Sequence, residues 1–151
     1  MTIFAQRWFS AVAVFFATAL IAASATADER IAVVESVYAH DGSRDTPPGG
    51  YEIWADEISV IWEDMLARAA AADAETPTVF PPTTGGDLSV ELITAADSEA
   101  AVSAVFDDGK SSAEVTFGLI EEDGAWKIRD VWREGRDGNR QYISEMLQQI
   151  P

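Results

Sequence analysis

The chain has 151 residues, no cysteine, and 26 acidic against 10 basic side chains, which give a formal net charge of −16 at pH 7. The missing cysteine excludes disulfides, zinc thiolate sites, a cysteine nucleophile and the lipid-modified cysteine of a bacterial lipoprotein. The negative charge excludes binding to nucleic acid or anionic membranes by bulk electrostatics. It favours a cationic partner, and it equally serves solubility or suits a saline habitat.

Residues 1–27 have the organisation of a cleavable signal peptide. Residues 1–7 form a short segment with one positive charge, residues 8–23 an almost unbroken apolar run, and residues 25–27 a small-x-small cleavage pattern. An uncleaved membrane anchor is the alternative, but the apolar run is shorter than the ~20 residues of a membrane span and is followed by acidic residues. We therefore expect a periplasmic or secreted protein, without membrane insertion after cleavage, and one domain over residues 28–151.

Apolar residues at helical spacing predict two amphipathic helices in the first half of this domain, over residues 29–39 and 52–72. Prolines and glycines in residues 42–50 and 76–87 predict exposed loops. A closing helix is expected after the turn and cap residues 137–139. Its apolar stripe consists of Tyr142, Ile143, Met146, Leu147 and Ile150.

Alternating apolar and polar residues predict four antiparallel strands over residues 88–92, 102–107, 112–119 and 126–133. Acidic residues and glycine form hairpin turns after the second and third of them. Segregated helices and a meander of strands indicate an α+β fold. We expect a curved antiparallel four-stranded sheet packed against N-terminal helices, with a C-terminal helix.

The segments Ala113–Phe117 and Glu122–Val131 carry a resemblance to a known superfamily. A strand, an acidic-glycine turn and Trp-Lys-Ile-x-Asp-Val resemble the ending of exported bacterial domains of unknown function in the nuclear transport factor two-like (cystatin-like α+β) superfamily. The resemblance implies a strongly bent sheet that wraps a long helix and leaves a cavity at its open end. Members usually finish on a strand, whereas this chain is expected to finish on a helix. Because members include isomerases, dehydratases, binding proteins and interaction modules, the resemblance does not choose a function.

Asp130 is the candidate catalytic residue. Strict alternation along the fourth strand predicts that its carboxylate shares the apolar face of the sheet with Trp126, Ile128 and Trp132. A carboxylate in an apolar cavity is a candidate general base, as in ketosteroid isomerase, which shares the superfamily fold. The alternative is that Asp130 caps a helix end, bonds a neighbouring tyrosine or indole, or sits at a bulge.

Four aromatic residues, Tyr38, Trp54, Trp126 and Trp132, are the candidate ligand-binding residues. They are placed to line a pocket if the sheet is curved. The alternative is a place in the core, because a domain this small needs its aromatic side chains to bury enough apolar area, at ~25 cal/mol per Å².

The last predicted strand and the following turn form the one basic zone of this acidic chain, with Arg129, Arg133, Arg136 and Arg140. Such a zone suits an anion. Pairing of the arginines with the abundant carboxylates is the simpler alternative.

The single histidine, His40, suits a proton shuttle or one metal ligand, or else the negative end of a helix. One histidine is too few for a zinc site, and no serine lies in a nucleophile-elbow motif. The acidic turns at 107–108 and 121–123 suit calcium only if they meet, and otherwise are solvated hairpin turns. We expect no metal and no cofactor.

From these patterns we expect an exported, non-catalytic binding or interaction domain of unknown specificity. Its partner is a small molecule or a protein, and inhibition or neutralisation of a cationic envelope protein is one role that fits the acidic charge. The alternative is a small cavity lyase or isomerase that uses Asp130 as general base. A structural accessory role and a homodimer are also open at this level.

Overall fold

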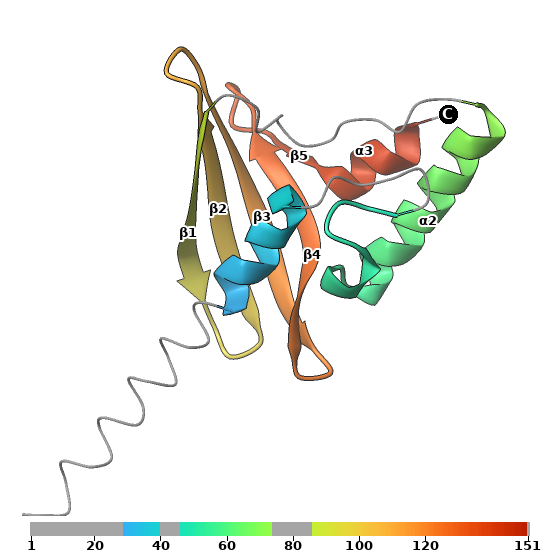
Figure 1. Ribbon diagram of the computed structural model, residues 1–151, viewed down its shortest axis with the longest axis horizontal. Helices are drawn as coiled ribbons and strands as arrows, with labels where there is room; N and C mark the ends of the chain where they lie inside the picture. Colours follow the sequence, from blue (N-terminus) through green and yellow to red (C-terminus); the bar gives the residue numbers. More distant parts are fainter. Residues whose placement is uncertain (1–28, 40–45, 74–85, 151) are drawn as a thin grey trace, which may run out of the picture.

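The computed structural model describes residues 29–39, 46–73 and 86–150, which form an α+β fold (Figure 1). The elements are a helix over residues 29–39, the 3₁₀ turn η1 (Tyr51–Ile53), α2 (Asp56–Ala71), β1 (Asp87–Ala95), β2 (Glu99–Asp107), β3 (Ser112–Glu122), β4 (Ala125–Glu134), β5 (Arg140–Tyr142) and α3 (Ile143–Gln149). The strands form one open antiparallel sheet in the order β1-β2-β3-β4-β5. The predicted signal peptide, residues 1–27, lies outside the described residues.

The sheet has a fifth strand that the sequence pattern did not predict. The turn after β4 closes with a hydrogen bond from the Gly135 N–H to the Asn139 carbonyl, 2.8 Å long, and Gly138 takes a φ of 77° there. This turn returns the chain so that Tyr142 pairs with Trp132. Tyr142 therefore belongs to β5, and the closing helix is shorter than expected. The three residues of β5 are too few to show an alternating pattern. The helical spacing that begins at Tyr142 therefore predicted a helix there instead of a strand.

The helix expected over residues 52–72 is interrupted near its start. Trp54 leaves the helical path and forms a parallel bridge with Ile128 of β4. The Ala55 N–H donates a 2.9 Å hydrogen bond to the Ile128 carbonyl, and α2 begins at the next residue. A short piece of chain thereby lies along half of the edge of β4 before the helix turns away.

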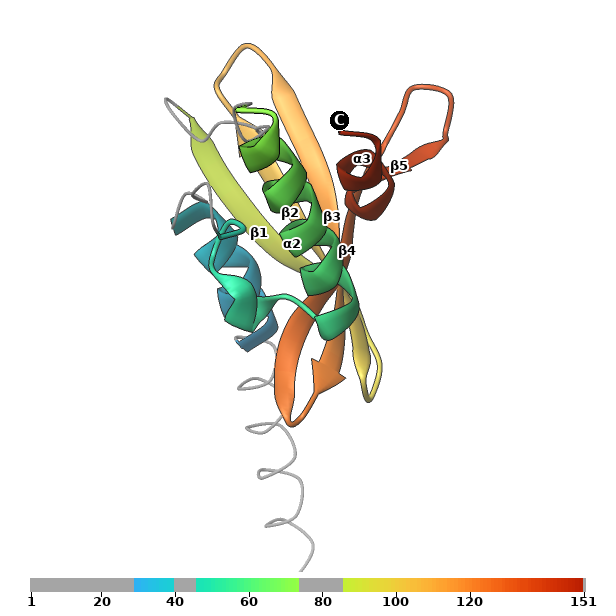
Figure 2. The same cartoon turned by 90° about the vertical axis from the view of Figure 1, so that its right-hand side faces the viewer.

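Both long helices pack against one face of the sheet, here called the inner face (Figures 1 and 2). The helix of residues 29–39 contributes Val34 and Val37, and α2 contributes Ile58, Trp62, Met65, Leu66 and Ala69 to a single core cluster. Val102, Phe117, Leu119, Ile128 and Val131 supply the sheet side of this cluster, each at most 1% exposed. No helix within the described residues is long and apolar enough to cross a membrane.

Candidate functional site

A β-bulge in β4 breaks the alternation on which the position of Asp130 was predicted. Leu119 of β3 pairs with Ile128, but the next β3 residue, Gly118, pairs with Asp130, so Arg129 is an extra residue on β4. One extra residue inverts the faces of all residues beyond it. The prediction that Asp130 shares a face with Ile128 and Trp126 is therefore wrong.

The bulge places Asp130 and Trp132 together on the outer face of the sheet. Val131 takes the inner position opposite Phe117 and is buried there. The edge of β4 changes partner at the same point, because Ile128 is bridged by Trp54 whereas the stretch from Trp132 onward pairs with β5. The bulge thus marks a gap between two segments that cover the same strand edge.

The Asp130 carboxylate in this gap holds the start of α3. Its Oδ1 accepts hydrogen bonds from the backbone N–H of Val131, at 2.8 Å, and of Ser144, at 3.2 Å. Its Oδ2 accepts the Ser144 hydroxyl at 2.6 Å. Tyr142, which precedes α3, makes no side-chain cap of its own. Asp130 therefore replaces a local N-cap from a distant part of the sequence, as the alternative interpretation of this residue anticipated.

The other end of α3 is held by Arg68 of α2. Its Nη2 donates to the Leu147 carbonyl at 2.9 Å, and its Nη1 donates to the Ile150 carbonyl. A helix of this length is not stable by itself. An anion at its N-terminus and a cation at its C-terminus both match the helix dipole. The α3 helix is thereby fixed between the sheet and α2.

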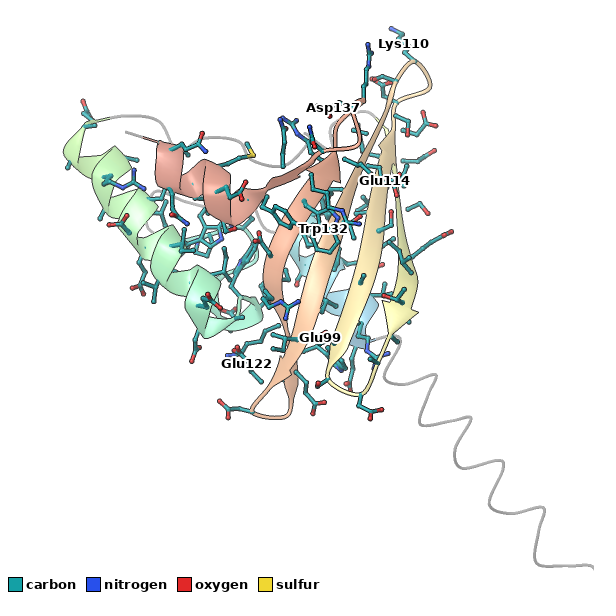
Figure 3. The ribbon with its side chains drawn as sticks, turned by 180° about the vertical axis from the view of Figure 1, so that it is seen from behind. Glu99, Lys110, Glu114, Glu122, Trp132 and Asp137 are labelled. Carbon is teal, nitrogen blue, oxygen red and sulfur yellow. The ribbon has the colours of Figure 1, made fainter. Side chains whose placement is uncertain are left out.

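A pocket of about 400 Å³ opens between α2, the bulge of β4, β5 and the start of α3. The side chains of Ile58 and Ile61 form its wall on α2, and Gly118 and Trp132 form its wall on the sheet. Figure 3 shows Trp132 next to the segment that runs from β5 into α3. The polar lining consists of Glu57, Arg129, Asp130, Arg140, Tyr142 and Ser144.

Gly118 is needed because Trp132 lies directly over it. A Cβ atom on Gly118 would lie 2.8 Å from Cζ3 of the indole, which is closer than van der Waals contact allows. The Tyr142 ring lies beside the indole with centroids 5.9 Å apart, and the Arg140 guanidinium lies over it, 5.4 Å from its centroid. These three neighbours fix one orientation of Trp132 in the pocket.

The charged groups of the pocket differ in how far they are already satisfied. Arg129 forms a 2.7 Å ion pair with Glu99. The Asp130 carboxylate accepts hydrogen bonds from the N–H and the hydroxyl of Ser144. Within the described residues, Arg140 forms no ion pair; its guanidinium lies over the face of Trp132, and Glu134 is its cross-strand neighbour on β4. The pairing expected for the basic zone therefore holds for Arg129, whereas Arg140 has its guanidinium donors available to a ligand.

The other three predicted ligand-binding aromatics do not line this pocket. Tyr38 packs edge-on against Phe117 with centroids 6.1 Å apart, and burial raises the pKa of Tyr38 to about 12. Trp54 is completely buried, and its indole N–H donates to the Pro48 carbonyl at 2.8 Å. Trp126 is covered by the Arg30 guanidinium, 4.2 Å from its ring centroid. For these residues the core interpretation describes their place.

Sequence reasoning missed Tyr142 and the wall on α2. Tyr142 was assigned to an apolar helical stripe, and only its pairing with Trp132 shows its place. Ile61 has the same spacing as the buried residues of α2 and is half-buried instead. Neither carries a local signal, because the bulge and β5 bring these side chains to the pocket.

The acidic turns do not form a metal site. They lie at opposite ends of β3 (Figure 1), so their carboxylates do not meet. Asp108 accepts hydrogen bonds from the backbone N–H groups of Ser111 and Lys110, which lower the pKa of its carboxyl. No group of three or more possible metal ligands occurs among residues 29–39, 46–73 and 86–150. His40 lies outside these ranges.

Comparison with known proteins adds no relative to this geometry. No protein-family model matches the chain, and no curated protein or solved structure matches it. The resemblance to the nuclear transport factor two-like superfamily therefore stays a prediction.

Proposed function

We propose that the protein is an exported binding domain that takes a small, flat organic anion in the pocket between α2 and the β4–β5 edge. One observation carries the proposal: Arg140 lies over the indole of Trp132 at the pocket and forms no ion pair with any described residue. The chain has far more carboxylates than cations. Arg140 forms no ion pair although Glu134 lies opposite it on β4, so its guanidinium beside the aromatic wall is a site that an external anion can complete.

The form of the pocket supports a ligand of modest size. Its volume of about 400 Å³ falls in the range typical of small-molecule sites, ~300–1,000 Å³. Ile58 and Ile61 face it from α2, and Trp132 faces it from the sheet. A flat ring in the pocket would contact the half-buried Ile61 and Trp132, while its acidic group reaches Arg140.

Most of the chain's negative charge opposes an anion from outside the pocket, and within the lining the carboxylates of Glu57 and Asp130 are balanced by Arg129 and Arg140. Charges farther than a Debye length, ~8 Å at physiological salt, are largely screened. A hydrogen bond from a guanidinium to a carboxylate contributes ~1.5–3 kcal/mol at contact. The local contact with Arg140 therefore outweighs the screened repulsion. Glu57, which is exposed at the start of α2, can accept a donor group of the same ligand.

The proposal is tested with three probes that share one ring system and differ in charge. Naphthalene-2-carboxylate, 2-naphthylmethanol and 2-naphthylmethylamine are titrated into the protein, and the indole N–H signal of Trp132 is followed by NMR. The carboxylate is expected to bind most tightly. Arg140→Gln removes the hydrogen bond from the guanidinium to the carboxylate probe. The affinity for this probe should fall by about tenfold or more, and a tenfold change corresponds to ~1.4 kcal/mol.

Arg133→Gln is the matched control for this experiment. Arg133 lies on the same strand as Trp132, and its replacement removes the same charge. Its side chain donates a hydrogen bond to Gln141 and does not line the pocket. Equal binding of all three probes, or equal loss in both variants, contradicts an anion site at Arg140. Tightest binding of the amine would assign the pocket to cations.

A second candidate function is a lyase or isomerase reaction with Asp130 as base. The observation that favours it is that the pocket holds Asp130 together with the phenol of Tyr142 and with Arg140. Both carboxylate oxygens, however, already accept hydrogen bonds from Ser144. A base in this position must give up one of these bonds to take a proton, which favours binding over catalysis.

The catalytic alternative has its own readout. The protein would accelerate exchange of the α-protons of 2-tetralone into deuterated water, and Asp130→Asn would remove this acceleration. Ser144→Ala, which frees one carboxylate oxygen, would retain or increase it. Exchange at the uncatalysed rate with the unmodified protein would leave only the binding function.

A further inference from the structure

The free edge of β1 lies at the opposite side of the sheet from β4 and β5, whose residues line the pocket (Figure 1). β2 pairs with one side of β1, and no described residue pairs with the other. The register with β2 is regular from Asp87 to Leu92, and a bulge at Ile93 interrupts it. This stretch therefore offers a straight run of main-chain donors and acceptors. It contains neither proline nor lysine, two residues with which proteins commonly block an exposed edge.

The charged residues within the strands next to this edge have one sign. β1, β2 and β3 contain no lysine or arginine, whereas the basic residues of the sheet lie on β4 and β5. The acidic residues of the first three strands are Asp87, Glu91, Glu99, Asp107, Glu114, Glu121 and Glu122. Asp87 is paired directly with Asp107, so two carboxylates lie side by side next to the free edge.

The two faces of β1 also differ in a regular way. Leu88, Val90 and Leu92 point to the inner face, where they are half-buried against the core. Asp87, Ser89 and Glu91 alternate with them and are exposed. A strand added along β1 would continue both rows, covering the apolar residues with its own apolar residues and placing its other side chains beside Asp87 and Glu91.

We infer that the β1 edge docks an extended segment of another protein in which Lys or Arg alternates with apolar residues, so that the segment becomes a sixth strand. Main-chain hydrogen bonds would provide the pairing. Opposite charges on neighbouring strands would provide the selectivity. A second copy of this chain is the less favoured occupant, because pairing two β1 edges brings two acidic rows together. The opposite edge, β5, has only three residues to offer.

The inference is tested with labelled peptides of alternating sequence and the intact protein. A Lys-Val repeat of six residues is compared with a Glu-Val repeat and with a Lys-Val repeat whose backbone nitrogens are methylated along one edge. Binding is measured by fluorescence anisotropy at low and moderate salt, and the contacted amides are mapped by NMR. The unmethylated Lys-Val peptide should bind, weaken with salt and perturb β1.

The double variant Asp87→Asn/Glu91→Gln should weaken the Lys-Val peptide about fivefold, because it removes two opposite-charge pairs. The control is Glu63→Gln/Glu145→Gln, which removes the same charge from exposed positions on α2 and α3. Equal weakening in both variants would mean attraction to the net charge and would overturn the inference. Equal affinity of the methylated peptide would also overturn it, since strand pairing needs the N–H groups.

The remaining outcomes are also decisive. Perturbation of β4, β5 or the pocket in place of β1 would assign the peptide to a different surface. Concentration-dependent perturbation of β1 without any peptide would show that a second copy occupies the edge and would overturn the choice of partner. Because the β1 variants leave Arg140 and Trp132 unchanged, binding of naphthalene-2-carboxylate should stay normal in them. A failure of the proposal for the β1 edge can thereby be distinguished from a failure of the proposal for the pocket.

Discussion

Replacement of Asp130 is expected to loosen α3 without unfolding the sheet. Asp130→Ala removes the acceptor of the Ser144 N–H and of the Ser144 hydroxyl, together with the charge at the helix N-terminus. Loss of an N-cap costs ~0.5–2 kcal/mol, and loss of a favourable helix-dipole charge ~0.3–1 kcal/mol. We therefore expect Asp130→Ala to lower the free energy of unfolding by about 2 kcal/mol.

Asp130→Asn separates the charge from the hydrogen bonds. The amide keeps one acceptor oxygen of similar shape, so it can still accept from the Ser144 N–H and the Val131 N–H. The amide lacks the negative charge, so the favourable interaction with the helix dipole is lost. We expect the free energy of unfolding to fall by about 1 kcal/mol. Glu134→Gln is the matched control, because Glu134 lies on the same strand, is exposed and makes no side-chain hydrogen bond among the described residues.

The assay is urea unfolding followed by circular dichroism, combined with amide hydrogen exchange. The expected order of stability is the unmodified protein and Glu134→Gln first, then Asp130→Asn, then Asp130→Ala. Exchange should accelerate at the amides of α3, including Leu147, and stay slow in β2, which β3 separates from β4. An Asp130→Ala protein with unchanged stability and unchanged α3 exchange would refute the anchoring role.

Three further predictions concern separate contacts. Arg68→Met removes the donors to the last carbonyls of α3 and should lower the free energy of unfolding in urea by about 1–2 kcal/mol. Faster amide hydrogen exchange that is limited to the first turn of α3 would contradict this prediction. Gly118→Ala should displace the Trp132 ring, shift its indole NMR signal and destabilise the protein by about 1–3 kcal/mol, whereas an unchanged signal would contradict the close approach. Tyr38 should titrate near pH 12 by ultraviolet spectroscopy, in a phase that Tyr38→Phe lacks, and loss of a phase near 10.0 in that variant instead would contradict its burial. Because its folded pKa is raised, the stability it contributes is complete below pH 10.0 and is lost as pH rises toward about 12, a loss that Tyr38→Phe should lack.

The main strands and helices could be predicted because their signals are local. The residues of β3 alternate in the sequence as they do in the structure, with Phe117 and Leu119 buried on the same side. The glycine turns also followed from sequence, since Gly109 and Gly124 take positive φ values of 78° and 77° that favour glycine. Alternation and turn chemistry depend on neighbours along the chain, so they are visible without the fold.

The position of Asp130 could not be predicted by the same reasoning. Its face depends on whether Arg129 is paired, and that depends on how β4 aligns with β3 and on which segments cover its edge. The aromatic pocket was likewise assigned to four residues of which Trp132 alone lines it, because burial of Trp54 and Trp126 depends on the helices packed against them.

The sequence by itself determined the α+β class, the four long strands and the acidic composition, and it indicated Asp130 and Trp132 as candidate site residues. Only the tertiary structure decided what Asp130 does, because its partner Ser144 lies 14 residues away and approaches through a strand of three residues. Hydrophobic alternation shows which side of a strand is buried. A bulge and the Asp130 contact with α3 depend instead on contacts between segments that are distant in the sequence. Such contacts produce no periodic pattern in the sequence, and the pocket depends on both the bulge and the contact with α3.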